Sequence, residues 1–118
     1  MIKMIDITEH AYIRMKERMG LSRHAAKKTA ETAFDLGIKF FETRGRLKKY
    51  LLGETRTYQK IGTRVVIYGE MVYIFSDFRK METGEEYAVL VTVWYIPNNL
   101  KNSALGLQRR KKERMAAG

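Results

Sequence analysis

The sequence predicts one α+β domain over residues 1–100, with two to three N-terminal helices packed on one face of a four-stranded antiparallel meander sheet. The chain of 118 residues is 45% hydrophobic, which is enough for one core. Its first half carries helix caps followed by apolar residues at helical spacing. Its second half carries runs of Val, Ile, Thr and aromatic residues that are separated by short glycine-containing turns. Such short connections join antiparallel neighbours.

Two helices are predicted before residue 38. Thr8 is a favourable N-cap for the first, and Gly20 is a favourable end. Its buried stripe is predicted to contain Tyr12, Met15 and Met19. Ser22 is a favourable N-cap for the second helix, which is predicted to stop at Gly37. The closely packed side of this second helix is predicted to carry Ala26, Ala30 and Ala33.

The middle of the chain predicts a short third helix and then the sheet. Residues 46–52 have helical character and are followed by Gly53, whereas residues 38–41 are ambiguous. The four predicted strands are residues 56–61, 64–68, 71–76 and 87–96. The last of these runs is apolar on both of its faces, so we expect it to be central in the sheet or covered on both sides.

Charge is concentrated in particular segments. The formal net charge is +10, and residues 1–100 contribute +5 of it, from 17 Lys/Arg and 12 Asp/Glu. Residues 101–118 contribute the other +5, from six Lys/Arg and one Glu. Because this last segment shows no apolar periodicity, we expect a flexible basic tail there.

Several function classes are excluded by composition. The chain has no cysteine, and His10 and His24 stand 14 residues apart with no metal-ligand spacing around them, so no metal centre and no cofactor are predicted. The longest apolar run has 10 residues, whereas a membrane span needs roughly 20. The N-terminus lacks the apolar region of a signal peptide. We therefore expect a cytoplasmic protein without a membrane partner.

One polar stripe on the first predicted helix has the residue types of a metal-independent ribonuclease. At 100° per residue, His10, Arg14, Glu17 and Arg18 fall on one side of the helix. Such an enzyme needs a general base and a general acid, and cations for the charge that builds on phosphorus. His10 is the candidate base or acid, and Arg14 and Arg18 are candidate phosphate ligands. The alternative is the solvated face of an amphipathic helix.

A second group combines cations with aromatic residues in the centre of the chain. Between residues 42 and 64 there are seven basic and two acidic residues. Cations neutralise phosphates and aromatic rings stack on unpaired bases, so this segment is typical of a nucleic-acid-binding surface. The predicted binding residues are Arg46, Lys48, Lys49, Tyr50, Arg56, Tyr58 and Arg64. The alternative is a surface that only keeps the protein soluble.

The stripe also carries a resemblance to a known group of proteins. The run from His10 to Gly20 resembles the H-A-x-x-R-x-x-E-R-G signature of small bacterial and phage proteins. These proteins are distantly similar to the barnase/RelE-type toxin ribonuclease superfamily, which combines N-terminal helices with a four-stranded antiparallel sheet. The likeness covers roughly residues 8–97, and it places none of the superfamily's sheet-borne catalytic residues on this sequence.

Together these observations favour an RNA-binding protein that is also a candidate metal-independent, toxin-like endoribonuclease. One alternative is a nucleic-acid-binding module without catalysis. Another is a small phage-type interaction or inhibitor protein that blocks an acidic or nucleic-acid-like surface on a partner.

Overall fold

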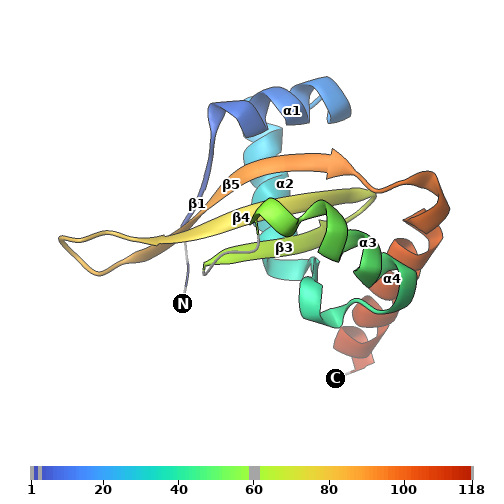
Figure 1. Cartoon of the computed structure of the whole chain (residues 1–118). Coiled ribbons are helices and arrows are strands. Elements are labelled where there is room, and N and C mark those ends of the chain that lie inside the picture. Colours follow the sequence, from blue (N-terminus) through green and yellow to red (C-terminus); the bar gives the residue numbers. More distant parts are fainter. Residues whose placement is uncertain (1, 3, 59–61, 118) are drawn as a thin grey trace.

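A mixed β-sheet runs through the middle of the molecule, with helices against both of its faces (Figure 1). The structure is a computed structural model that describes residues 2, 4–58 and 62–117. The strands in this described part are β1 (Met4–Ile7), β2 (Ile38–Lys39), β3 (Thr63–Tyr68), β4 (Met71–Arg79) and β5 (Glu86–Tyr95), in the spatial order β1-β5-β4-β3-β2. The helices there are α1 (Glu9–Met19), α2 (Arg23–Leu36), α3 (Gly45–Glu54) and α4 (Lys101–Ala117), with 3-10 turns η1 (Phe40–Glu42), η2 (Arg56–Tyr58) and η3 (Asn98–Leu100).

The predicted caps of the first two helices are confirmed. The Thr8 hydroxyl accepts a hydrogen bond from the Ala11 backbone N–H, and the chain leaves α1 at Gly20 with a left-handed φ of 68°. The Ser22 hydroxyl caps α2 in the same way, by accepting from the Ala25 backbone N–H. The third predicted helix is α3, which extends two residues beyond its predicted end and contains Gly53.

The meander of four antiparallel strands is present, but its first member was predicted wrongly. Residues 56–58 form η2 rather than a strand, and residues 59–61 lie outside the described part of the chain. The first strand of the meander is instead β2, which comes from the ambiguous segment 38–41. Ile38 of β2 pairs with Ile67 of β3. The pairing continues from β3 to β4 and from β4 to β5, all antiparallel.

The prediction of a purely antiparallel sheet is wrong because a fifth strand, β1, pairs parallel with β5. Ile5 lies opposite Ala88 and Ile7 lies opposite Leu90 in this pair. β5 is therefore flanked by strands on both sides. Its two faces are apolar because its side chains enter two cores, with Leu90 in one and Val91 packed against the other.

Helices cover both faces of the sheet, not one as predicted. On the first face, α1 and α2 pack on Tyr73 and Phe75 of β4 through a core that includes Met15 and Ala30. On the second face, α3 and α4 pack on the alternate side chains of the same strand, with Ile74 among them. Side chains that alternate along β4 thus belong to two separate cores.

The segment after residue 100 is an ordered helix, which corrects the prediction of a flexible tail. Leu100 and Ala104 are buried in the second core, and Leu107 packs against it. The Gln108 side chain then bonds the backbone of Gly69 twice, by accepting from its N–H at 2.7 Å and donating to its carbonyl oxygen at 2.8 Å. These contacts fix α4 to the turn between β3 and β4.

Candidate nucleic-acid interface

The polar stripe of α1 is only partly available for chemistry. His10 is exposed and makes no hydrogen bond or ion pair within residues 4–58 and 62–117. Arg14 lies 3.6 Å from the carboxylate of Glu17 and is about two-fifths exposed. The Arg18 guanidinium donates to the carbonyl oxygen of Val93 at 2.6 Å, which ties α1 to β5. His10, Arg14 and Arg18 share one helix face as predicted. The guanidinium of Arg18, however, is already engaged in a hydrogen bond between α1 and β5.

Three of the predicted binding cations are exposed on the side of the sheet that α3 and α4 cover. Arg46 and Lys49 on α3 and Arg56 on η2 are exposed, and none of them forms an ion pair with another described residue. Lys48 is half-buried, with its ammonium 5.7 Å from the centroid of the Phe40 ring. This part of the predicted surface can attract an anion.

The two predicted stacking residues are used inside the protein instead. The Trp94 indole N–H donates to the hydroxyl of Tyr50 at 3.0 Å, and burial raises the pKa of Tyr50. Tyr58 stacks on the same indole, with the ring centroids 6.2 Å apart. Both tyrosines pack against the second core, so the described contacts explain them as structural residues.

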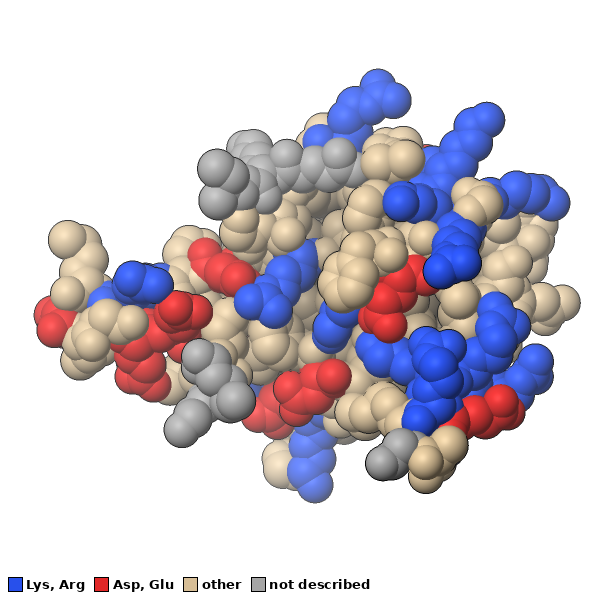
Figure 2. Space-filling model, turned by 90° about the horizontal axis from the view of Figure 1, so that it is seen from below, with Lys and Arg blue, Asp and Glu red and all other residues tan. Residues whose placement is uncertain are grey.

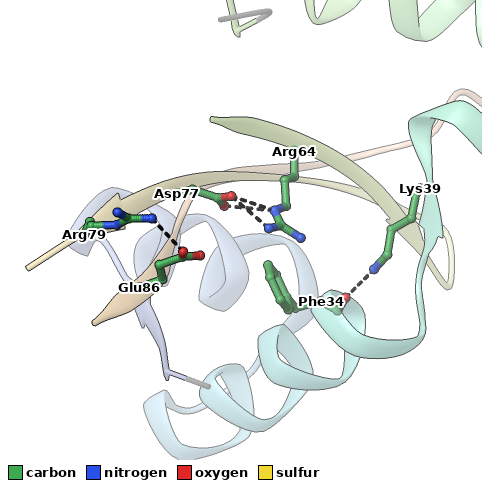
Figure 3. A network of polar contacts seen from close by, with 6 residues as sticks. All are labelled: Phe34, Lys39, Arg64, Asp77, Arg79 and Glu86. Atoms are coloured by element: carbon green, nitrogen blue, oxygen red, sulfur yellow. Dashed lines mark hydrogen bonds and ion pairs between the residues drawn. The ribbon is translucent and has the colours of Figure 1, made fainter. Parts of the chain in front are cut away.

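Arg64 lies on the opposite face from the other predicted cations. Its guanidinium donates to both carboxylate oxygens of Asp77, at 2.9 and 2.8 Å, and lies 4.9 Å from the centroid of the Phe34 ring (Figure 3). A bidentate pair on an aromatic ring already satisfies the planar guanidinium. Figure 3 also shows Lys39 donating to the carbonyl oxygen of Phe34, at the same end of α2. Arg64 is therefore separated from the surface for which it was predicted.

The helices α3 and α4 place their charges at one end of the molecule, which the sequence did not indicate. Figure 2 shows Lys and Arg side chains crowded at the end where these helices lie, opposite the hairpin of β4 and β5. Residues 42–58 and 98–117 hold eleven Lys/Arg and three Asp/Glu, a net charge of +8 out of +10 for the chain. Eight cations of this basic end are exposed and form no ion pair with a described residue: Arg44, Arg46, Lys49, Arg56, Arg109, Arg110, Lys112 and Arg114.

A groove of about 450 Å³ runs between α3 and α4 within the basic end. Arg44 lines it from the start of α3, and Arg110 lines it from α4. Gly106 leaves room for this arrangement, because a Cβ atom there would lie 3.3 Å from a guanidinium nitrogen of Arg110. Asn102 and Ser103 add polar groups to the lining. Two guanidinium forks and neutral hydrogen-bonding groups are the chemistry that binds phosphate oxygens.

Neither a cluster of metal ligands nor a membrane-spanning helix is found within residues 2, 4–58 and 62–117. Among the described residues, no three His, Asp or Glu side chains are grouped so that they could hold a metal ion. No helix in that part of the chain has the length and apolar character needed to span a bilayer. No family model, curated protein or solved structure matches this chain.

Proposed function

We propose that the protein binds RNA through the basic end, with the phosphates of the strand held by α3 and α4. The observation that supports this most directly is a set of eight exposed cations, none of them paired with an acid of the described residues, that two distant segments bring to one end of the molecule. A surface that only maintained solubility would spread its charges and mix their signs. A concentrated positive field attracts a polyanion and releases its counterions.

The groove between α3 and α4 is the part of the basic end where we expect a phosphate of the RNA strand to bind. Arg44 and Arg110 line it from two different helices, so a phosphate between them can receive two guanidinium forks. The absence of a free aromatic ring in the predicted patch favours backbone contacts over base stacking, because Tyr50 and Tyr58 are engaged with Trp94. RNA is the form of nucleic acid that the resemblance of the α1 signature implies.

The test is the salt dependence of binding to a labelled single-stranded RNA of about 20 nucleotides. The double variant Arg44→Gln, Arg110→Gln removes two charges from the groove. Its matched control, Lys16→Gln, Lys28→Gln, removes two exposed charges from α1 and α2 on the other face. For a single strand, the loss of two phosphate contacts lowers the slope of log affinity against log salt concentration by about 1.4.

We expect this drop for the groove variant and a much smaller one for the control. No binding of RNA by the unaltered protein, or equal effects of the two double variants, would contradict the proposal. The same oligonucleotide made as DNA reports whether the 2′-hydroxyls contribute.

Catalysis is a separate prediction that a different observation supports. His10 is exposed in the first turn of α1 and is free of partners in the described part of the chain. However, α1 packs on the first face of the sheet, whereas the basic end is built on the second. RNA binding is therefore proposed independently of cleavage.

A further inference from the structure

A second hollow, of about 680 Å³, lies on a different side of α4 from the groove. Its walls come from the end of α2, the end of β3 and the last turns of α4. The lining includes Leu36, Tyr68 and Met115 together with Arg109, Lys111 and Lys112. It therefore combines an apolar interior with a cationic rim.

The apolar walls of this hollow are unusually accessible. Leu36 is 51% exposed and Met115 is 59% exposed, and Tyr68 beside them is half-buried. Apolar side chains that gather at the surface mark interaction sites more often than scattered ones do. Tyr, Met and Arg are also the residues enriched in protein–protein interfaces, and Met adapts its shape to a partner side chain.

The polar groups at the floor are already satisfied. Gln108 is bonded to the backbone of Gly69 through both ends of its amide. The Lys111 ammonium donates to the carbonyl oxygen of Gly37 at 2.9 Å and to the carboxylate of Glu42 at 2.8 Å. The side-chain amide of Gln108 and two of the three N–H groups of Lys111 are therefore already used by contacts within the protein. These contacts also hold α4 in place, so the hollow exists before a ligand arrives.

What remains for a ligand is apolar contact in the centre and positive charge at the rim. Arg109 and Lys112 are exposed and unpaired among the described residues. A nucleic-acid backbone would use these cations but would leave Leu36 and Met115 uncovered. An apolar protein segment flanked by carboxylates would satisfy both features.

We propose that this hollow docks an acidic, amphipathic segment of a protein partner. The apolar side chains of the segment would lie between Leu36, Tyr68 and Met115, and its carboxylates would face Arg109 and Lys112. This interaction goes beyond RNA binding: it uses two cations of the basic end, Arg109 and Lys112, on a different side of α4 from the groove that Arg44 and Arg110 line.

The experiment selects peptides from a random library on the immobilised full chain and measures the binding of an enriched peptide by fluorescence anisotropy. We expect enriched sequences that combine Asp or Glu with Leu, Ile or Phe. Leu36→Gln and Met115→Gln should each weaken binding about three- to tenfold, because each side chain is only about half exposed and the peptide buries the apolar surface that remains. Ile13→Gln on α1, where the side chain is 54% exposed, is the matched control and should change binding less than twofold.

Arg109→Gln combined with Lys112→Gln should remove most of the salt dependence of peptide binding, whereas the Arg44, Arg110 double variant should not. The proposal is overturned if no peptide is enriched, if the enriched peptides are basic or uncharged, or if Leu36→Gln binds them as the unaltered protein does. It is also overturned if Leu36→Gln weakens the binding of single-stranded RNA as much as it weakens the binding of the peptide, because the hollow would then belong to the nucleic-acid surface. Failure of RNA binding leaves all these peptide measurements unaffected.

Discussion

Lys111 and Glu42 join the last helix to the edge of the sheet, with 2.8 Å between the ammonium and the carboxylate. Their side chains are only 18% and 21% exposed. The same ammonium donates to the carbonyl oxygen of Gly37, so one lysine links α4 both to η1 and to the end of α2. Lys111 thus has a structural role that the neighbouring cations Arg110 and Lys112 lack among the described contacts.

Replacement of this lysine should therefore lower stability without affecting the rest of the surface charge. We expect Lys111→Met to reduce the free energy of unfolding by about 1–3 kcal/mol, because it removes the ammonium donor from a half-buried carboxylate, which keeps only the Lys39 backbone N–H, and from the carbonyl oxygen of Gly37. Urea denaturation measures the change. Lys112→Met removes the same charge from an exposed position and should stay within about 0.5 kcal/mol of the unaltered protein. Equal stabilities of the two variants would show that the contact is dispensable.

Stability should also fall in acid because of Glu42. Burial acts to raise the pKa of Glu42, but hydrogen bonds from the Lys111 ammonium and the Lys39 backbone N–H outweigh it and hold the pKa below its ordinary value. The unfolded chain therefore binds this proton at a higher pH than the folded chain does. The contribution of Glu42 is complete above the unfolded pKa of about 4.3 and is lost as the pH falls through the folded pKa. Chemical denaturation between pH 6 and pH 2 should show a weaker pH dependence for Glu42→Gln.

Gly37 is predicted to be intolerant of any side chain. Its φ of −66° is ordinary, so the requirement is space: a Cβ atom would lie 2.2 Å from Cγ1 of Val66 and 2.5 Å from the carbonyl oxygen of Ala33. We expect Gly37→Ala to cost about 3 kcal/mol, at the upper end of overpacking substitutions. Gly53→Ala should instead stabilise the protein by about 0.5–1 kcal/mol, because that position lies within α3 and has open space around it. Thermal unfolding distinguishes the two, and a mild effect at Gly37 would contradict the close approach.

The α1 stripe predicts metal-independent cleavage of RNA that depends on His10. If the prediction is right, His10→Ala should slow cleavage about 10²–10⁴-fold in the presence of EDTA, the usual effect of losing a general acid or base. His24→Ala, which removes the other exposed histidine, is the control and should cut normally. The products should end in 2′,3′-cyclic phosphate. RNA that stays intact with the unaltered protein would show that the stripe is not catalytic, and binding by the basic end would still stand.

Local signals predicted the first half of the fold well. Thr8 and Ser22 determine where α1 and α2 begin through bonds to backbone N–H groups three residues away, and such bonds depend on adjacent sequence only. β1 could not be recognised in the same way, because four residues that include an aspartate carry little strand signal of their own. The apolar character of both faces of β5 was the available sign, since the last strand of a meander would otherwise be an edge strand.

The helix α4 was missed because its buried side is only half apolar. Leu100, Ala104 and Leu107 have helical spacing, but the next residues on the same side are Gln108 and Lys111. Their polar ends are satisfied by partners that lie far away in the sequence, which no periodicity can reveal.

Only part of the candidate site was predicted, because the rest of it also depends on contacts between distant segments. The cations of α3 could be predicted from the sequence. The cations that α4 places beside them depend on tertiary structure, and so does the pairing of Arg64 with Asp77, which keeps Arg64 out of the site.

The parallel pairing of β1 with β5 determines when the sheet can form during synthesis of the chain. Of the described strands, β1 is made before all the others and β5 after all the others, so the two can pair only when the whole sheet has been synthesised, with Ile5 opposite Ala88 and Ile7 opposite Leu90. Until then α1 has no β5 to rest on, and the Thr8 and Arg18 contacts with that strand cannot form. A nascent chain that stops before Glu86 is therefore expected to keep the apolar sides of α1 and α2 open to chaperones or to aggregation.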